Sequence, residues 1–247
     1  MPTDPVFYVT AIIALLIVGI AKGGLGGGIG IVGVPLMSLA IDPIRAAAIM
    51  LPILLVMDVF AVRAWRGRWD VQNLRTMIPG AVLGTVVGFV TFRMLSPDAM
   101  RLLVGALALA ISLNWFVGPR VPKPKPRSMM RGTFWSGLSG FTSFGIHAGG
   151  PPAQVYLLSQ QLDKSTFQAT TVAFFFIVNW LKLPFYAWLG QLDFANLSTS
   201  LVLAPLAPLG IWLGGILHER INEAAFYRVV YVSLIVVGAK LIYDGLT

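Results

Sequence analysis

The chain lacks cysteine altogether and has few histidines and few charged residues. Without cysteine, disulfides, thiolate catalysis and thiolate metal sites are excluded, and two histidines, at positions 147 and 218, are too few for a histidine cluster. Charged residues make up 11% of the 247 positions, whereas soluble domains carry about 25%. These shortages exclude a soluble globular fold, and they predict a protein that uses no metal and no other cofactor.

Apolar residues make up 57% of the chain. Since about 20 apolar residues span a bilayer as a helix, the sequence predicts an all-α polytopic membrane protein with about eight transmembrane helices. The predicted spans are residues 6–21, 46–62, 77–92, 102–117, 132–146, 169–189, 201–217 and 226–242. Several of these runs are short, so we expect broken or tilted helices that pack inside the protein.

A basic, proline-rich linker at residues 118–131 divides the chain, because its prolines exclude a helix. The flanking segments, 1–117 and 132–247, each hold four predicted spans and repeat several residues in the same order. The matched pairs are Gly24 with Gly140, Gly33 with Gly149, Pro35 with Pro151, Asp42 with Asp163, Asp58 with Asn179, and Asp70 with Asp193. We interpret the segments as two related four-helix repeats within one membrane unit, a pattern typical of transporters. The even number of spans favours a parallel repeat, whereas a re-entrant glycine segment would allow an inverted one.

Positive charge, with a formal net value of +8, is concentrated in two connections. One follows the second predicted span and holds Arg63, Arg66, Arg68 and Arg75, and the other is the linker. By the positive-inside rule both are cytoplasmic, where they meet anionic lipid headgroups. With eight crossings they share the side of the N-terminus, which predicts cytoplasmic termini. No aromatic interleaving or nucleic-acid-binding fold accompanies this charge, so we expect no nucleic-acid partner.

Two glycine-rich segments interrupt the apolar pattern, residues 23–35 (GGLGGGIGIVGVP) and residues 140–152 (GFTSFGIHAGGPP). Glycine costs about 1 kcal/mol relative to alanine within a helix, so we expect both helices to break there. The first segment contains a formal G-x-G-x-x-G pattern. It follows a helical run instead of a strand, which argues against dinucleotide binding.

Backbone N–H groups that are freed at a break inside the membrane can bind an anion. On this interpretation the candidates for substrate binding are Gly26, Gly27 and Gly28 in the first break and Ser143, His147, Gly149 and Gly150 in the second. The alternative is that the glycines only allow close helix packing. Packing is the role we expect for the spaced glycines at positions 80, 84, 88, 210 and 214.

Three ionisable residues stand out within or beside the predicted spans, where charge is expensive: Lys22, Asp58 and Lys182. Lys182 lies one helical turn after Asn179 on the same face, and we predict that both line the substrate site together with Lys22. Asp58 occupies the repeat position of Asn179 and is a candidate for proton coupling. The alternatives are a lysine that snorkels to the headgroups and a fixed ion pair of Asp58 with Lys22 or Arg63.

Three segments in this order resemble the TauE/SafE family of sulfite and organosulfonate exporters: residues 23–35, residues 144–152 (FGIHAGGPP) and residues 174–186 (FFFIVNWLKLPFY). The resemblance implies a multi-pass carrier in the bacterial inner membrane for small sulfur-containing anions, with two related halves. The second break departs from a run of three glycines, with Thr-Ser-Phe at residues 142–144.

The sequence therefore predicts a secondary transporter, and no enzyme, that binds a small oxyanion between the two breaks. No G-x-x-x-x-G-K-[ST] loop is present for nucleotide hydrolysis, so transport would be driven by an ion or proton gradient, in the direction of export. Two alternatives are an anion channel with the same lining and an intramembrane enzyme. An enzyme would need a nucleophile with a base, or a pair of carboxylates. Asp58 is the only carboxylate within the predicted spans, so the sequence does not support this alternative.

Overall fold

The computed structural model describes residues 2, 4–24, 31–118, 125–217 and 223–247, and over these residues it contains helices but no strand. The eleven helices are α1 (Pro5–Gly24), α2 (Gly33–Met37), α3 (Pro43–Ala64), α4 (Val71–Phe92), α5 (Pro97–Val117), α6 (Met129–Ile146), α7 (Gly150–Leu158), α8 (Lys164–Trp188), α9 (Phe194–Leu203), α10 (Leu206–Leu217) and α11 (Glu223–Leu246). The all-helical class predicted from the sequence is therefore confirmed.

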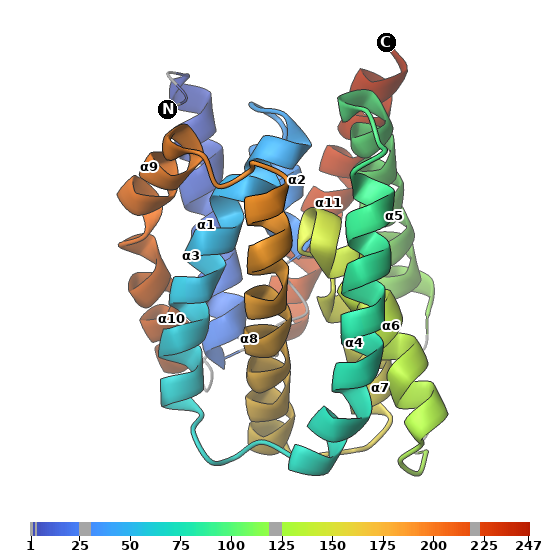
Figure 1. Ribbon diagram of the computed structural model, residues 1–247. Helices are drawn as coiled ribbons and strands as arrows, with labels where there is room; N and C mark the ends of the chain where they lie inside the picture. Colours follow the sequence, from blue (N-terminus) through green and yellow to red (C-terminus); the bar gives the residue numbers. More distant parts are fainter. Residues whose placement is uncertain (1, 3, 25–30, 119–124, 218–222) are drawn as a thin grey trace.

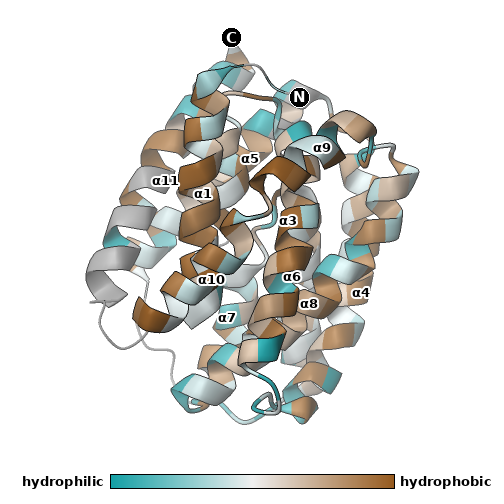
Figure 2. Cartoon of the chain, turned by 90° about the vertical axis from the view of Figure 1, so that its left-hand side faces the viewer, coloured by the Kyte–Doolittle hydropathy of each residue, from teal (hydrophilic) through white to brown (hydrophobic). Residues whose placement is uncertain are grey.

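Each predicted span coincides with a helix, except that residues 201–217 divide between α9 and α10. Within the described residues, five segments are long and apolar enough to cross a membrane: Pro5–Gly24, Pro43–Ala64, Val71–Phe92, Lys164–Trp188 and Phe194–Leu217. Figure 2 shows hydrophobic residues along the flanks of α1, α3 and α10. A count of eight crossings stays a prediction.

Aspartate side chains begin four of the long segments. Asp42, Asp70, Asp163 and Asp193 each accept a hydrogen bond from backbone N–H groups in the first turn of α3, α4, α8 and α9, respectively. Such N-caps satisfy donors that have no partner within the helix. The four aspartates form two of the matched pairs, so both halves begin corresponding helices in the same way.

The loops before α4 and α9 share a longer pattern, Gly-x-x-Asp-x-x-Asn, at residues 67–73 and 190–196. Gly67 and Gly190 have φ angles of +78° and +68°, a region that glycine adopts without strain. In each loop the asparagine amide also donates to the capping aspartate, at 3.2 Å for Asn73 and 3.2 Å for Asn196. The two turns are thus equivalent in sequence and in geometry.

The main helix pairs correspond when the halves are exchanged. α1 packs along α10 as α6 packs along α4, α3 crosses α8 at the centre, and α5 pairs with α11. Figure 1 shows that α1 and α3 descend from the end that holds the N-terminus, whereas α6 and α8 ascend toward it. Corresponding helices therefore run in opposite directions. This is the geometry of an inverted repeat, and it supports our proposal that the halves are related.

Glycines allow the close approach of the outer helix pairs. A Cβ atom added at Gly19 of α1 would lie 2.7 Å from the Cα atom of Gly210 in α10. In the other half, a Cβ atom at Gly84 of α4 would overlap the carbonyl oxygen of Gly137 in α6. Backbones in contact at this distance are typical of membrane helices with small residues at the interface. The packing role predicted for the spaced glycines is confirmed at these positions.

The basic connections lie at the end of the bundle opposite both termini (Figure 1). Arg127, in the described part of the linker, donates to Asp70 at 2.8 Å, so the linker meets the loop between α3 and α4. The prediction that these connections share the side of the N-terminus is wrong. The reason is that α2 turns back inside the bundle, so that α1 and α3 run in the same direction and the parity of the crossings changes.

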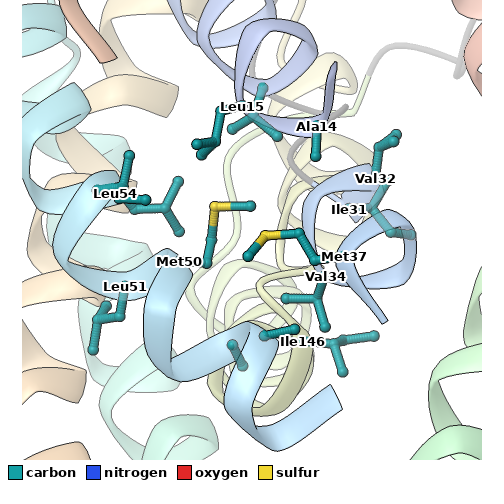
Figure 3. Close-up of a cluster of buried hydrophobic side chains, with 14 of the residues drawn as sticks. Ala14, Leu15, Ile31, Val32, Val34, Met37, Met50, Leu51, Leu54 and Ile146 are labelled. Atoms are coloured by element: carbon teal, nitrogen blue, oxygen red, sulfur yellow. The ribbon is translucent and has the colours of Figure 1, made fainter. Parts of the chain in front are cut away.

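Residues 31–37, at the end of the first glycine break, pack against apolar side chains of the protein. Ile31 and Val32 are buried, and the side chains of Val34 and Met37 in α2 lie against Met50 of α3 (Figure 3). At the start of α2, a Cβ atom on residue 33 would overlap the methyl group of Met50. Over residues 31–37 this break therefore serves packing. The predicted site residues Gly26, Gly27 and Gly28 lie outside the described residues.

Candidate functional site

Lys22, Asp58 and Asn179 meet where α1, α3 and α8 come together. Lys22 forms an ion pair with Asp58, and the Asn179 side-chain amide donates to the other carboxylate oxygen of Asp58 at 2.6 Å. Asp58 is fully buried. Of the partners considered from the sequence, Lys22 is the one that the structure places on Asp58. Because both oxygens accept from N–H donors, the geometry holds this side chain as a carboxylate.

Lys182 points into the protein from α8 and is completely buried. Its ammonium group donates to the carbonyl oxygen of Ser143 at 3.0 Å and to the Ser143 hydroxyl at 3.1 Å. It also lies 2.7 Å from Nδ1 of His147. Snorkelling is therefore excluded for Lys182 in this conformation. Within the described parts of the chain its hydrogen-bond partners are all neutral, and a buried charge without a counter-charge is costly.

His147 links three helices. It ends α6 in the left-handed conformation, with φ at +54°, and its Nε2 atom lies 3.0 Å from the carbonyl oxygen of Ala47 in α3. A carbonyl only accepts, so Nε2 carries the hydrogen atom and Nδ1 accepts from Lys182. The ring is thus neutral in this arrangement. It orients the Lys182 ammonium group from one side while the Ser143 oxygens hold it from the other.

A small cavity lies between these groups, with a volume of about 20 Å³, which suffices for about one water molecule. Its lining residues are Lys22, Leu54, Ser143, His147, Gly150, Phe175 and Asn179. The structure thus brings together five of the residues predicted to bind substrate, and Lys182 contacts two of them. The conformation is closed around the site.

The second break contributes fewer backbone donors than its glycine pattern predicts. Gly150 lines the cavity at the start of α7, but the next two residues are Pro151 and Pro152, which have no N–H group. The carbonyl oxygen of Gly149 accepts from the Ser139 hydroxyl at 2.6 Å, and this residue does not line the cavity. Positive charge at the site therefore comes from lysine side chains more than from helix N-termini.

Sequence reasoning missed two polar groups around the site. Gln168 of α8 is buried and donates to the Lys22 carbonyl oxygen at 2.7 Å, and its own side-chain oxygen has no partner among the described residues. The Tyr186 hydroxyl donates to the Phe144 carbonyl oxygen at 2.5 Å. Gln168 was detectable, because it precedes Asn179 by eleven residues and so falls on the same helix face.

A family model described as sulfite exporter TauE/SafE matches residues 11–241 of the chain. The chain belongs to the TauE/SafE family. The resemblance read from the glycine breaks and residues 174–186 is thereby confirmed, and the candidate spans among the described helices agree with a multi-pass membrane protein. The described residues show no group of three or more acidic or histidine side chains that could hold a metal.

A probable sulfite/organosulfonate exporter TauE from Cupriavidus necator is 26% identical to this chain over 170 residues. The match covers 68% of the chain and 66% of that relative, just under two thirds of its length. No solved structure matches the chain.

Proposed function

We propose that the protein exports small sulfur-containing oxyanions, sulfite or organosulfonates, across the bacterial inner membrane. The observation that carries this proposal is the Lys182 ammonium group, fully buried in α8 and held by neutral partners only, as far as the described chain extends. An anion is the ligand that such a group requires. The family, and the relative described as a probable sulfite/organosulfonate exporter, supply the sulfur chemistry of that anion.

The oxyanion accepts hydrogen bonds from Lys182, from the Ser143 hydroxyl and from the Asn179 amide, which all face the small cavity or adjoin it. A sulfonate group is larger than a cavity of about 20 Å³, so the site must expand when the substrate enters. Rigid-body movement of one inverted half against the other is the usual way in which transporters open such a site to each side in turn.

The energy for transport comes from a gradient. A membrane potential that is negative inside favours the exit of an anion by about 2.3 kcal/mol per charge at 100 mV. Asp58 is the proposed proton-coupling group. A proton on its carboxylate would break the ion pair with Lys22 and so link proton uptake to a change in the site.

For the orientation we now propose that both termini lie on the periplasmic side. The arginine-rich loop between α3 and α4 and the described part of the linker lie at the end opposite the termini (Figure 1). By the positive-inside rule that end is cytoplasmic, where it meets anionic headgroups. The sequence predicts cytoplasmic termini. The proposed orientation differs because α3 runs away from the end that holds the termini, so the arginine-rich loop after it lies at the opposite end.

The test is a thermal-shift screen of the purified protein against sulfite, thiosulfate, sulfate, sulfoacetate and taurine. We expect at least one of these anions to raise the melting temperature, and we expect Lys182→Met to abolish the rise. Lys240→Met is the matched control, because Lys240 is exposed and pairs with Asp244 at 2.7 Å. Failure of every anion to stabilise the wild-type protein, or an undiminished response in Lys182→Met, would overturn the proposal.

Saturable counterflow of the stabilising anion in liposomes would then separate a carrier from a channel. Chemical alteration of the anion would instead indicate an intramembrane enzyme.

A further inference from the structure

The charged groups around the small cavity leave one positive charge in excess. Lys22 and Lys182 each carry one positive charge, Asp58 carries one negative charge, and the His147 ring is neutral. We infer, on the basis of the proposed function, that the site takes singly charged anions, organosulfonates or hydrogen sulfite, in preference to doubly charged sulfite, sulfate or thiosulfate.

Asp58 neutralises the charge of Lys22 where α1 packs against α3. Asp58 is fully buried, one of its oxygens is paired with Lys22, and the other accepts from Asn179. The remaining titratable side chain at the site, the Tyr186 hydroxyl, is neutral and donates to a backbone carbonyl oxygen. With Asp58 ionised, Lys182 is therefore the cation, among the described side chains around the cavity, that an arriving anion can neutralise.

A doubly charged anion would fit this balance poorly. Its first charge would be matched by Lys182, but the second would be buried without a counter-charge, and close to the Asp58 carboxylate. Burial of an unmatched charge is strongly unfavourable in a site of low dielectric constant. A singly charged anion leaves the site neutral, so its cost of burial is the lowest.

The apolar part of the lining points to the same class of substrate. Leu54 and Phe175 line the cavity together with the polar groups, and they are 4% and 7% exposed. A hydrocarbon group on sulfur gains contact with these side chains, whereas an oxygen atom in that place would lose its hydrogen bonds to water. An organosulfonate presents one charged sulfonate end and one carbon end, which matches a lining that is partly polar and partly apolar.

The experiment compares methanesulfonate, which is singly charged, with sulfate, which is doubly charged, by calorimetric titration of the purified full-length protein at neutral pH. We expect the wild-type protein to bind methanesulfonate at least about tenfold more tightly than sulfate. Asp58→Asn adds a positive charge to the site, so the affinity ratio should shift toward sulfate by about tenfold or more. Lys22→Met/Asp58→Asn removes one charge of each sign and should restore the preference for methanesulfonate.

The outcomes separate the inference from the proposed function. If wild-type protein prefers sulfate, and Lys182→Met removes that binding, the charge inference is overturned while anion transport stands. If neither anion binds at any concentration tested, both are overturned. The wild-type ratio decides the question even where a variant fails to fold. Among folded variants, an affinity ratio in Asp58→Asn equal to that of the wild-type protein also overturns the inference.

Discussion

Asp58 of α3 accepts a hydrogen bond of 2.6 Å from Asn179 of α8, and the two residues occupy corresponding positions in the two halves of the chain. The bond therefore lies where the inverted halves meet. In transporters built from inverted repeats the substrate site lies near the bilayer midplane at this junction. Lys22 and Lys182 reach the same place from α1 and α8, which gives the junction its excess of positive charge.

One arginine contact at each end of the bundle joins segments that are distant in the sequence. Arg127 donates to Asp70 at 2.8 Å and to Asn73 at 3.3 Å, and so ties the linker to the start of α4 at the basic end of the bundle. At the opposite end Arg45 donates to Asn196 at 3.3 Å, beside a surface pocket of about 360 Å³. The two asparagines occupy the same position in the two loops that share the Gly-x-x-Asp-x-x-Asn pattern, and we predict that the two contacts act as latches, one at each end.

We expect Arg127→Gln to expose the site from the basic end. Since the chain lacks cysteine, Ser143→Cys supplies a single thiol at the cavity. Exposed ion pairs contribute about 0–1 kcal/mol, so the rate of thiol labelling in inside-out vesicles should rise by no more than about fivefold. Arg45→Gln, in the same background, should raise the labelling rate in right-side-out vesicles. An increase on the same side for both variants would contradict this assignment of the latches.

The glycine contacts between helices predict unequal effects of alanine. Gly84→Ala places a methyl group on the backbone of α6, and overpacking of this kind costs about 1–3 kcal/mol, so the melting temperature should fall. Gly215→Ala is the control, because a Cβ atom there has nothing within 4 Å and alanine favours the helix. Equal melting temperatures for the two variants would show that α4 and α6 pack differently.

The membrane orientation can be mapped with single cysteines at the two ends. Arg66 is exposed in the loop between α3 and α4, and Gln191 lines the surface pocket at the other end. In intact cells a membrane-impermeant thiol reagent should label Gln191→Cys and should leave Arg66→Cys unlabelled until the membrane is permeabilised. The reverse pattern would place the termini in the cytoplasm, as the count of crossings in the sequence predicts.

The sequence predicts the helices well because a bilayer demands long apolar runs, and it predicts Lys22, Asn179 and Lys182 because polar groups in such runs are rare. The pair of Lys22 with Asp58 is one of the alternatives that the sequence offers, but the partners of Lys182 could not be predicted, since Ser143 and His147 are 39 and 35 residues away and meet it only through tertiary packing. The sequence leaves parallel and inverted repeats open because α2 and α7, with 5 and 9 residues, are too short to be recognised as spans. The role of His147 depends on a left-handed backbone conformation that hydropathy does not reveal.

The proposed coupling role of Asp58 predicts the pH dependence of transport. A proton on Asp58 would break the ion pair with Lys22, so the transport rate should change with pH. Asp58→Asn holds the side chain permanently neutral and should flatten the profile of initial rate against pH. The measurement uses proteoliposomes in which the membrane potential is clamped, so that only the proton gradient varies.

Asp163→Asn is the control for this experiment. Asp163 is exposed at the start of α8, and hydrogen bonds from the Thr166 side chain and backbone lower its pKa below the ordinary value. It is therefore ionised throughout the neutral range, and asparagine is an equally good N-cap. We expect its pH profile to match that of the wild-type protein. If Asp58→Asn also keeps the wild-type profile, Asp58 is a fixed partner of Lys22 and the potential alone drives the anion outward.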